Sequence, residues 1–207
     1  EISECLVGSE MCIRDRPEGG FAPLLSKGRC LTGYSFPPAY HTLKKSRLIM
    51  LKYVNHDIVF QEFPDEVTLA INLSCCPNGC TGCHSAYLRG DVGEELTLQR
   101  LEALIESYAG EITCVALMGG DNDPQTVASH LQYVRRHFDR RYKTGWYSGR
   151  TQLPESAVLQ SAFNYVKLGP YRPQCGPLSS PDTNQRFYKV LPDGSLDDLT
   201  FRFQKRR

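Results

Sequence analysis

From Met50 onward the chain alternates between short apolar strands and amphipathic helices, and this alternation constrains its fold most. Residues 67–73 and 112–118 have the apolar density of buried strands. Between them, Thr97 can cap a helix that runs to about Tyr108 with its leucines on one stripe. Strands separated by helices predict a mainly parallel sheet with flanking helices. The fold class is therefore α/β.

The same patterns predict the rest of the fold. They indicate a β-prone segment at 53–63, a helix begun by Asp123-Pro124 at 123–140 and a strand at 142–147. A short helix at 155–161, another strand at 165–168 and a C-terminal hairpin at 186–203 follow. The hairpin pairs 186–191 with 199–203 around the turn Pro192-Asp193-Gly194. These units are too few to close eight strands, so we expect an open, partial (β/α) barrel.

A cysteine loop, CCPNGCTGCH at residues 75–84, directly follows the first apolar strand. Its thiols Cys76, Cys80 and Cys83 have the spacing C-x3-C-x2-C. Cysteine thiolates hold iron–sulfur clusters, and three of them can hold three irons of a cubane cluster while the fourth stays open. An open iron can bind a substrate, whereas a fully ligated cluster only transfers electrons. The spacing therefore predicts catalysis at a cluster.

Loops after the other predicted strands also carry residues suited to a ligand. They read Met118-Gly119-Gly120-Asp121, Ser148-Gly149-Arg150 and Gly169-Pro170-Tyr171. Because the loops after parallel strands meet at one rim, we expect these three to lie beside the cysteine loop. Paired glycines let a ligand approach the backbone, and a carboxylate suits an amino group. The alternative for the glycine pair is a tight turn leading into the Asp123 cap.

Two other metal sites are compatible with the cysteines. Cys76, Cys80, Cys83 and His84 could form a zinc site, although adjacent residues reach one tetrahedral ion poorly. Cys75 in place of Cys76 gives a ferredoxin-like interval, which lacks a fourth cysteine unless Cys114 or Cys175 supplies it. We expect Cys114 to be a core residue, because it lies within a strand, and Cys175 to be a free loop thiol.

Residues 1–49 differ from the rest of the chain. Residues 6–16, LVGSEMCIRDR, resemble a translated sequencing adapter, and residues 17–49 are rich in Pro, Gly and Ser without a repeating apolar face. We expect the whole segment to be a non-native or disordered extension, and Met50 to be the natural start of a single domain that spans 50–207. Its cysteines, Cys5, Cys12 and Cys30, are then excluded from the metal site.

Charge and hydropathy exclude several classes of function. The 24 Lys and Arg against 23 Asp and Glu leave a net charge of +1, so no overall field favours nucleic acid or an anionic membrane. No apolar run reaches the roughly 20 residues that span a bilayer, and residues 1–20 lack the apolar core of a signal peptide. We expect a cytoplasmic protein whose clustered cysteines ligate metal.

The loop CPNGCTGCH resembles the cysteine signature of radical S-adenosylmethionine enzymes, and the Gly-Gly-Asp after the next strand is similar to their motif for the cofactor's amino group. Gly82 before the third cysteine, His84 after it, the segment WYSG and Asn184-Gln185-Arg186 together resemble the activating proteins of anaerobic ribonucleoside-triphosphate reductase. The resemblance covers the chain from about Met50 onward. It departs from the motif at MGGDNDP, where Asn122 stands between acids.

This resemblance implies a [4Fe–4S] cluster and S-adenosylmethionine as cofactors. Cys76, Cys80 and Cys83 would ligate iron. The residues expected to receive the methionine end of the cofactor or to line its cleft are Gly119, Gly120, Asp121, Ser148 and Gly149. The activity implied is reductive cleavage of S-adenosylmethionine to generate a glycyl radical on the reductase, with flavodoxin or ferredoxin as electron donor.

Other activities remain open within the radical class. The chain could activate a different glycyl radical enzyme, of the pyruvate formate-lyase type, or act on a free metabolite. Its small size favours a protein substrate, because a minimal open barrel leaves little material to enclose a small molecule.

Overall fold

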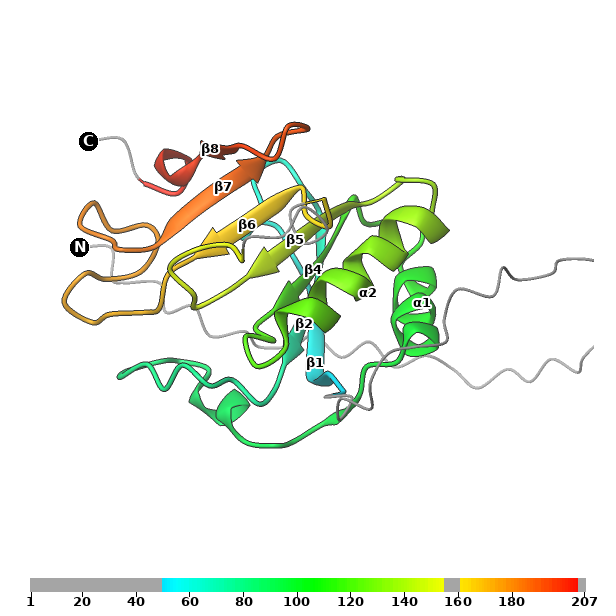
Figure 1. Cartoon of the computed structure of the whole chain (residues 1–207), viewed down its shortest axis with the longest axis horizontal. Coiled ribbons are helices and arrows are strands. Elements are labelled where there is room, and N and C mark those ends of the chain that lie inside the picture. Colours follow the sequence, from blue (N-terminus) through cyan, green and yellow to red (C-terminus); the bar gives the residue numbers. More distant parts are fainter. Residues whose placement is uncertain (1–49, 155–160, 205–207) are drawn as a thin grey trace, which may run out of the picture. The chain divides into compact units, whose positions relative to one another are not determined.

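The computed structural model describes residues 50–154 and 161–204; the extension predicted for 1–49 and nearly all of the short helix predicted for 155–161 lie outside these ranges. The described residues form one eight-stranded sheet (Figure 1). Its strands are β1 (Lys52–Val59), β2 (Thr68–Leu73), β3 (Glu94–Glu95), β4 (Cys114–Met118), β5 (Lys143–Tyr147), β6 (Tyr165–Leu168), β7 (Arg186–Val190) and β8 (Leu196–Asp198). The helices are α1 (Leu98–Ser107), α2 (Pro124–His137) and the 3-10 turns η1 (Ala86–Arg89) and η2 (Thr200–Arg202).

The sheet is mixed, which corrects the prediction of a mainly parallel one. Its order is β3-β1-β2-β4-β5-β6-β7-β8, and only the central strands β2, β4, β5 and β6 pair in parallel. β1 pairs antiparallel with β2, and β7 with β8, because the short connections 60–67 and 191–195 turn the chain straight back instead of crossing over. The pairs β1–β3 and β6–β7 are also antiparallel. With β3 and β8 at its edges the sheet is open, as predicted, and does not close into a barrel.

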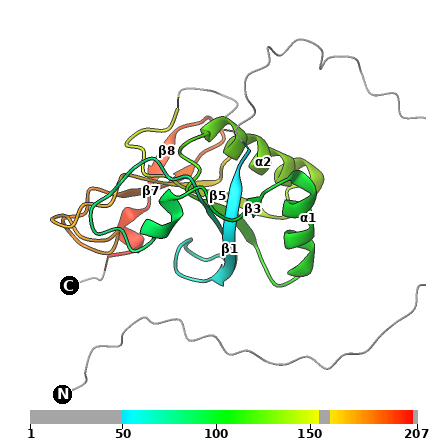
Figure 2. The ribbon, with the colours of Figure 1, turned by 90° about the horizontal axis from the view of Figure 1, so that it is seen from below.

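Both α-helices cover the same face of the sheet, as Figure 1 and the turned view in Figure 2 show. Thr97 caps α1 through a bond from the amide of Arg100, and Asp123 caps α2 through a bond from the amide of Thr126, as the sequence predicts. The buried strand side chains of this layer alternate along the strands, and the helix residues Val127 and Leu131 pack against them. The strand residues include Leu69, Ile71, Leu73, Val115, Leu117, Trp146, Val166 and Leu168.

The opposite face of the sheet has a smaller aromatic core. Phe63, from the β1–β2 connection, packs against Tyr165 and Phe187 with ring centroids 6.1 and 5.6 Å away. Gly145 makes room for Phe63, because a Cβ there would lie 2.2 Å from its ring. Toward the carboxyl ends of the parallel strands this face is not filled, and a cavity opens there.

The C-terminal hairpin is confirmed, but its second strand is Leu196–Asp198 and not 199–203. Residues 200–202 form η2 instead, which turns Phe203 onto Phe187 with ring centroids 4.8 Å apart. Phe203 and Phe187 bury their rings in the smaller aromatic core, and this burial offsets the backbone hydrogen bonds that a strand at 199–203 would have made. The sequence patterns also missed β3 and η1, which are too short to show periodicity.

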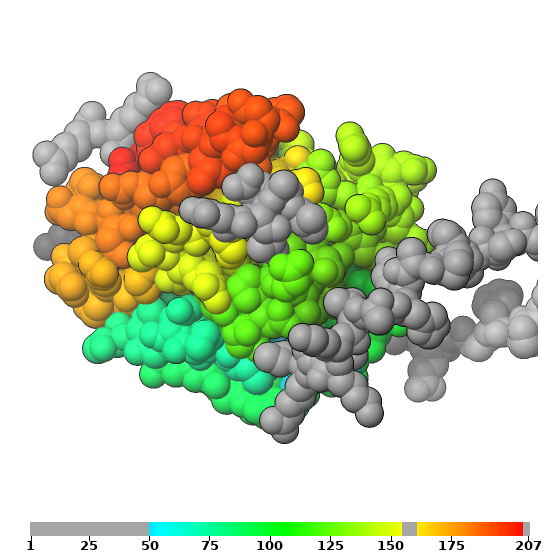
Figure 3. Space-filling model, viewed as in Figure 1, coloured from blue at the N-terminus to red at the C-terminus, as the bar shows by residue number. Residues whose placement is uncertain are grey.

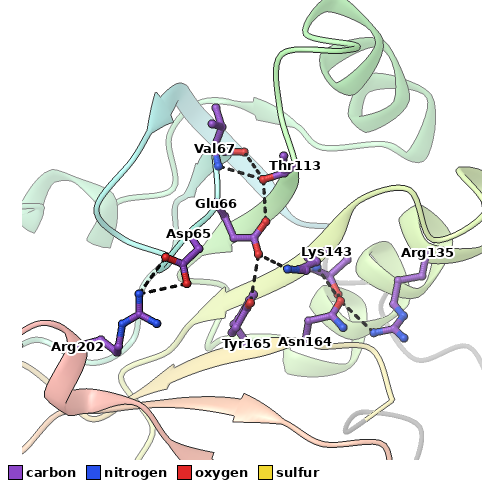
Figure 4. Close-up of polar contacts among 10 residues, drawn as sticks. Asp65, Glu66, Val67, Thr113, Arg135, Lys143, Asn164, Tyr165 and Arg202 are labelled. Carbon is purple, nitrogen blue, oxygen red and sulfur yellow. Dashed lines mark hydrogen bonds and ion pairs between the residues drawn. The ribbon is translucent and has the colours of Figure 1, made fainter.

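A buried carboxylate joins the amino ends of the parallel strands, at the end of the sheet away from the cavity (Figure 4). Glu66, whose side chain is 3% exposed, accepts hydrogen bonds from Thr113 Oγ1 at 2.7 Å and Tyr165 Oη at 3.1 Å, and it pairs with Lys143. The hydrogen bond to Glu66 raises the pKa of Lys143, and burial raises the pKa of Tyr165. The neighbouring Asp65 makes an exposed ion pair with Arg202.

We expect Glu66→Leu to lower the free energy of unfolding by about 1–3 kcal/mol, because it leaves the buried Tyr165 hydroxyl without an acceptor. Urea unfolding measures this difference. The matched control is Asp65→Asn, which breaks an exposed pair and should change stability little. Equal stability of the two variants would contradict this role of Glu66.

Candidate functional site

A cavity of about 510 Å³ opens at the carboxyl ends of the parallel strands. All four predicted loops contribute to its wall, so the prediction that they meet at one rim is confirmed. Figure 3 shows the teal cysteine loop beside the orange segment that follows β6, and a Cβ on Gly82 would lie 3.5 Å from Pro173 and 3.6 Å from Tyr171.

One row of side chains forms the floor of this cavity. Asn72, Met118, Tyr147 and Lys167 are the last inward-facing residues of β2, β4, β5 and β6, and each is the register partner of the next. Residues in register on parallel strands point to the same face of the sheet. The strand pairing therefore sets the floor, and the loops above it supply the walls.

The cysteine loop contributes three cysteines to the wall of the cavity. Cys76, Cys80 and Cys83 all line it. The loop is held by backbone bonds from Cys76 N to Leu88 O at 3.0 Å and from Cys83 N to Cys80 O at 3.3 Å, and Arg89 donates to the Cys80 carbonyl. The three predicted ligands thus lie in one short segment, which is held by a hydrogen bond within the loop and by two bonds to η1.

Cys75 does not line the cavity, although it is adjacent to Cys76. Its backbone has a left-handed φ of 59°, and its thiol lies 3.6 Å from the Asp91 carboxylate and 3.9 Å from Ser74 Oγ. This position supports the choice of Cys76 over Cys75 as the first ligand, which the sequence made on spacing alone.

The glycine loop after β4 is held against β5. Trp146 Nε1 donates to the Gly119 carbonyl at 2.7 Å, and Gly119 N donates to the Tyr147 carbonyl at 2.9 Å. Gly119 lines the cavity, with a left-handed φ of 99°. Gly120 does not, and a Cβ there would lie 2.5 Å from Val127, so this glycine lets the loop pack closely on α2.

Asp121 is the most connected side chain of the site. It is 3% exposed, and its carboxylate accepts hydrogen bonds from Ser148 Oγ, from Asn78 Nδ2 and, at 2.8 Å, from Gly149 N. Arg150 donates to its carbonyl at 2.9 Å. The predicted site residues Asp121, Ser148 and Gly149 are therefore bonded to one another and to the cysteine loop.

Sequence reasoning missed Lys167, the one Lys or Arg among the described residues that line the cavity. Its ammonium donates to the Gly169 carbonyl at 2.9 Å and lies 5.8 Å from the centroid of the Tyr147 ring. Desolvation lowers the pKa of Lys167 to about 8, although Asp121, Cys80 and Cys83 act in the opposite direction. The only sequence signal was a polar residue at an inward position of β6.

Within the described residues no group of three or more His, Cys, Asp or Glu side chains is placed to hold a metal ion. No fourth cysteine lines the cavity among these residues. Cys114 is fully buried in the core, where burial raises its pKa to about 12, and Cys175 is partly exposed in the loop after β6.

Comparison with protein-family models, with curated proteins and with solved structures finds no match to this chain. In the described ranges neither α-helix has the length and apolar character needed to cross a membrane. The assignment of function therefore depends on the geometry of the cavity and on the sequence motifs.

We expect Cys76→Ser to lose most of the iron that the wild-type chain retains after anaerobic reconstitution with iron and sulfide, because it removes a thiolate that faces the cavity. Cys75→Ser is the matched control one residue away, and it should retain iron like the wild type. Iron and sulfide are measured after desalting. The reverse pattern would show that the first ligand is Cys75.

Proposed function

We propose that this chain is a radical S-adenosylmethionine activase that generates a glycyl radical on anaerobic ribonucleoside-triphosphate reductase. One observation carries the proposal: among the described residues, three cysteines and no fourth line the same cavity as the Gly119 and Asp121 loop. The open α/β sheet, with its loops at the carboxyl ends of parallel strands, is compatible with a partial barrel of the radical S-adenosylmethionine type.

Each part of the cavity has a task in this proposal. Cys76, Cys80 and Cys83 would hold a [4Fe–4S] cluster with one open iron. When bound and reduced, this cluster supplies the electron that cleaves S-adenosylmethionine, so that a hydrogen atom can be taken from a glycine of the reductase. The chain's own residues bind and orient the cofactor and its partner.

The methionine end of S-adenosylmethionine carries an ammonium and a carboxylate, and the cavity has a group for each. Asp121 accepts three hydrogen bonds and lies 4.0 Å from Arg150 Nε, but a carboxylate has about four acceptor sites, so it can still accept from an ammonium. Lys167 can donate to the carboxylate, since its ammonium bonds only one protein carbonyl among the described residues. Gly119 lines the cavity, so a ligand can approach its backbone closely.

A protein substrate is favoured over a free metabolite by the exposed aromatic side chains near the cavity. Phe60, Tyr87 and Phe201 are 69%, 54% and 61% exposed, and each is within two residues of one that lines the cavity. Such large exposed apolar side chains would give a partner protein apolar contacts next to the cavity. An activase for another glycyl radical enzyme remains the second candidate, because the same surface would serve it.

The chain reconstituted with iron and sulfide without oxygen and then reduced should convert S-adenosylmethionine into methionine and 5'-deoxyadenosine, measured by chromatography. Cys80→Ala should abolish this conversion, because it removes a cluster ligand. Full conversion by Cys80→Ala, or zinc in place of iron in anaerobically purified protein, would contradict the proposal.

The Lys167 ammonium makes cofactor binding depend on pH. Its pKa is lowered to about 8, so the charged form is present below that pH and is lost above it, and affinity for S-adenosylmethionine should fall as pH rises through 8. A bound carboxylate shifts this loss to higher pH. At pH 7, Lys167→Met should weaken binding by about 10-fold, the equivalent of one charged hydrogen bond.

Equilibrium dialysis of the anaerobic protein measures this affinity. Lys189→Met, on the exposed side of β7, is the matched control and should bind like the wild type. Unchanged affinity in Lys167→Met would remove Lys167 from the cofactor site.

A further inference from the structure

The middle of the cysteine loop carries a residue that the cluster motif does not explain. Asn78 is the central residue of CPNGC, and its side-chain nitrogen lies within hydrogen-bonding distance of two acceptors. Nδ2 donates to the Asp121 carboxylate, and it lies 3.6 Å from Cys76 Sγ. One amide group therefore joins a predicted iron ligand to the buried acid of the neighbouring loop.

Asp121 also accepts hydrogen bonds from the loop after β5. Its second oxygen accepts from Ser148 Oγ, and the oxygen that binds Asn78 also accepts from Gly149 N at 2.8 Å. Three loops that follow three different strands thus meet at one carboxylate. Since Asp121 is buried, an unpaired donor in this group would be costly.

Close packing fixes the position of the Asn78 amide. Gly149 lies directly against it, and a Cβ on Gly149 would be 2.3 Å from Nδ2. The space left by Gly149 is therefore filled by Asn78. A methyl group there must push the amide away from both Cys76 and Asp121.

We propose that Asn78 is a positioning residue. Asp121 holds its amide in place, and the amide fixes the Cys76 side chain and, through its hydrogen bond to the Cys76 sulfur, tunes the reduction potential of the cluster. The inference rests on the proposed function, because it requires a cluster on Cys76. Hydrogen bonds to ligand sulfurs reduce the negative charge on the thiolate, which favours the reduced cluster and makes the potential less negative. Removing the bond should therefore make the potential more negative.

The test compares full-length wild type, Asn78→Leu and Asn78→Asp after anaerobic reconstitution, with circular dichroism to confirm that each is folded. Asn78→Leu keeps the approximate size of the side chain without its donor. We expect this variant to lose iron to a chelator about 10-fold faster than wild type, the scale found for residues that support metal ligands. We also expect the midpoint potential of its remaining clusters, from a redox titration followed by spectroscopy, to be more negative.

Two further variants sharpen the result. Asn78→Asp removes the amide that donates to the Cys76 sulfur and places a carboxyl group against Asp121, so its potential should also be more negative than that of wild type. Gly149→Ala leaves Asn78 unchanged but displaces its amide, and should shift the potential in the same direction as Asn78→Leu. Gln99→Leu, at an exposed position on α1 that does not line the cavity, is the control and should match wild type.

Failure of the inference and failure of the proposed function give different results. Wild-type protein that holds a cluster, with an unchanged potential in Asn78→Leu, overturns the inference alone. Reduced iron retention with an unchanged potential also overturns it, because Asn78 would then only support the fold of the loop. Wild-type protein that holds no iron–sulfur cluster overturns the proposed function and this inference with it.

Discussion

The site depends on the parallel pairing of four central strands. In this register Asn72, Met118, Tyr147 and Lys167 form one row across β2, β4, β5 and β6, and the chain leaves each strand at the same edge. Loops separated by many residues in the sequence are thereby brought around one cavity. A change of register by one residue in any of these strands would turn its floor residue into the helix-covered core.

Hydrogen bonds to a buried acid then fix the loops relative to one another. Asp121 connects its own loop to Asn78 and to Ser148 and Gly149, while Trp146 holds the Gly119 carbonyl. At the other end of the strands Glu66 has a comparable role among Thr113, Lys143 and Tyr165. Each end of the parallel sheet is thus joined through one buried carboxylate, and the end that carries Asp121 opens into the cavity lined by the cysteine loop.

Elements with a strong hydrophobic periodicity were predictable from the sequence. Features that depend on interactions between residues far apart in the chain were not. The caps Thr97 and Asp123 and the buried strands β2 and β4 are local features, so their positions were predictable. The mixed pairing was not, because strand direction depends on connections that carry no periodic signal. Asn78 and Lys167 went unnoticed for the same reason, since their partners lie on other loops and strands.

The central claim is that Cys76, Cys80 and Cys83 hold a cluster whose fourth iron is open to S-adenosylmethionine. Electron paramagnetic resonance of the reduced, reconstituted chain, recorded before and after S-adenosylmethionine is added, tests this claim most directly. The account predicts the signal of one reduced cluster per chain, and a change in that signal when the cofactor binds at the open iron. A cluster signal that S-adenosylmethionine leaves unchanged, or a chain that retains no iron, would contradict it.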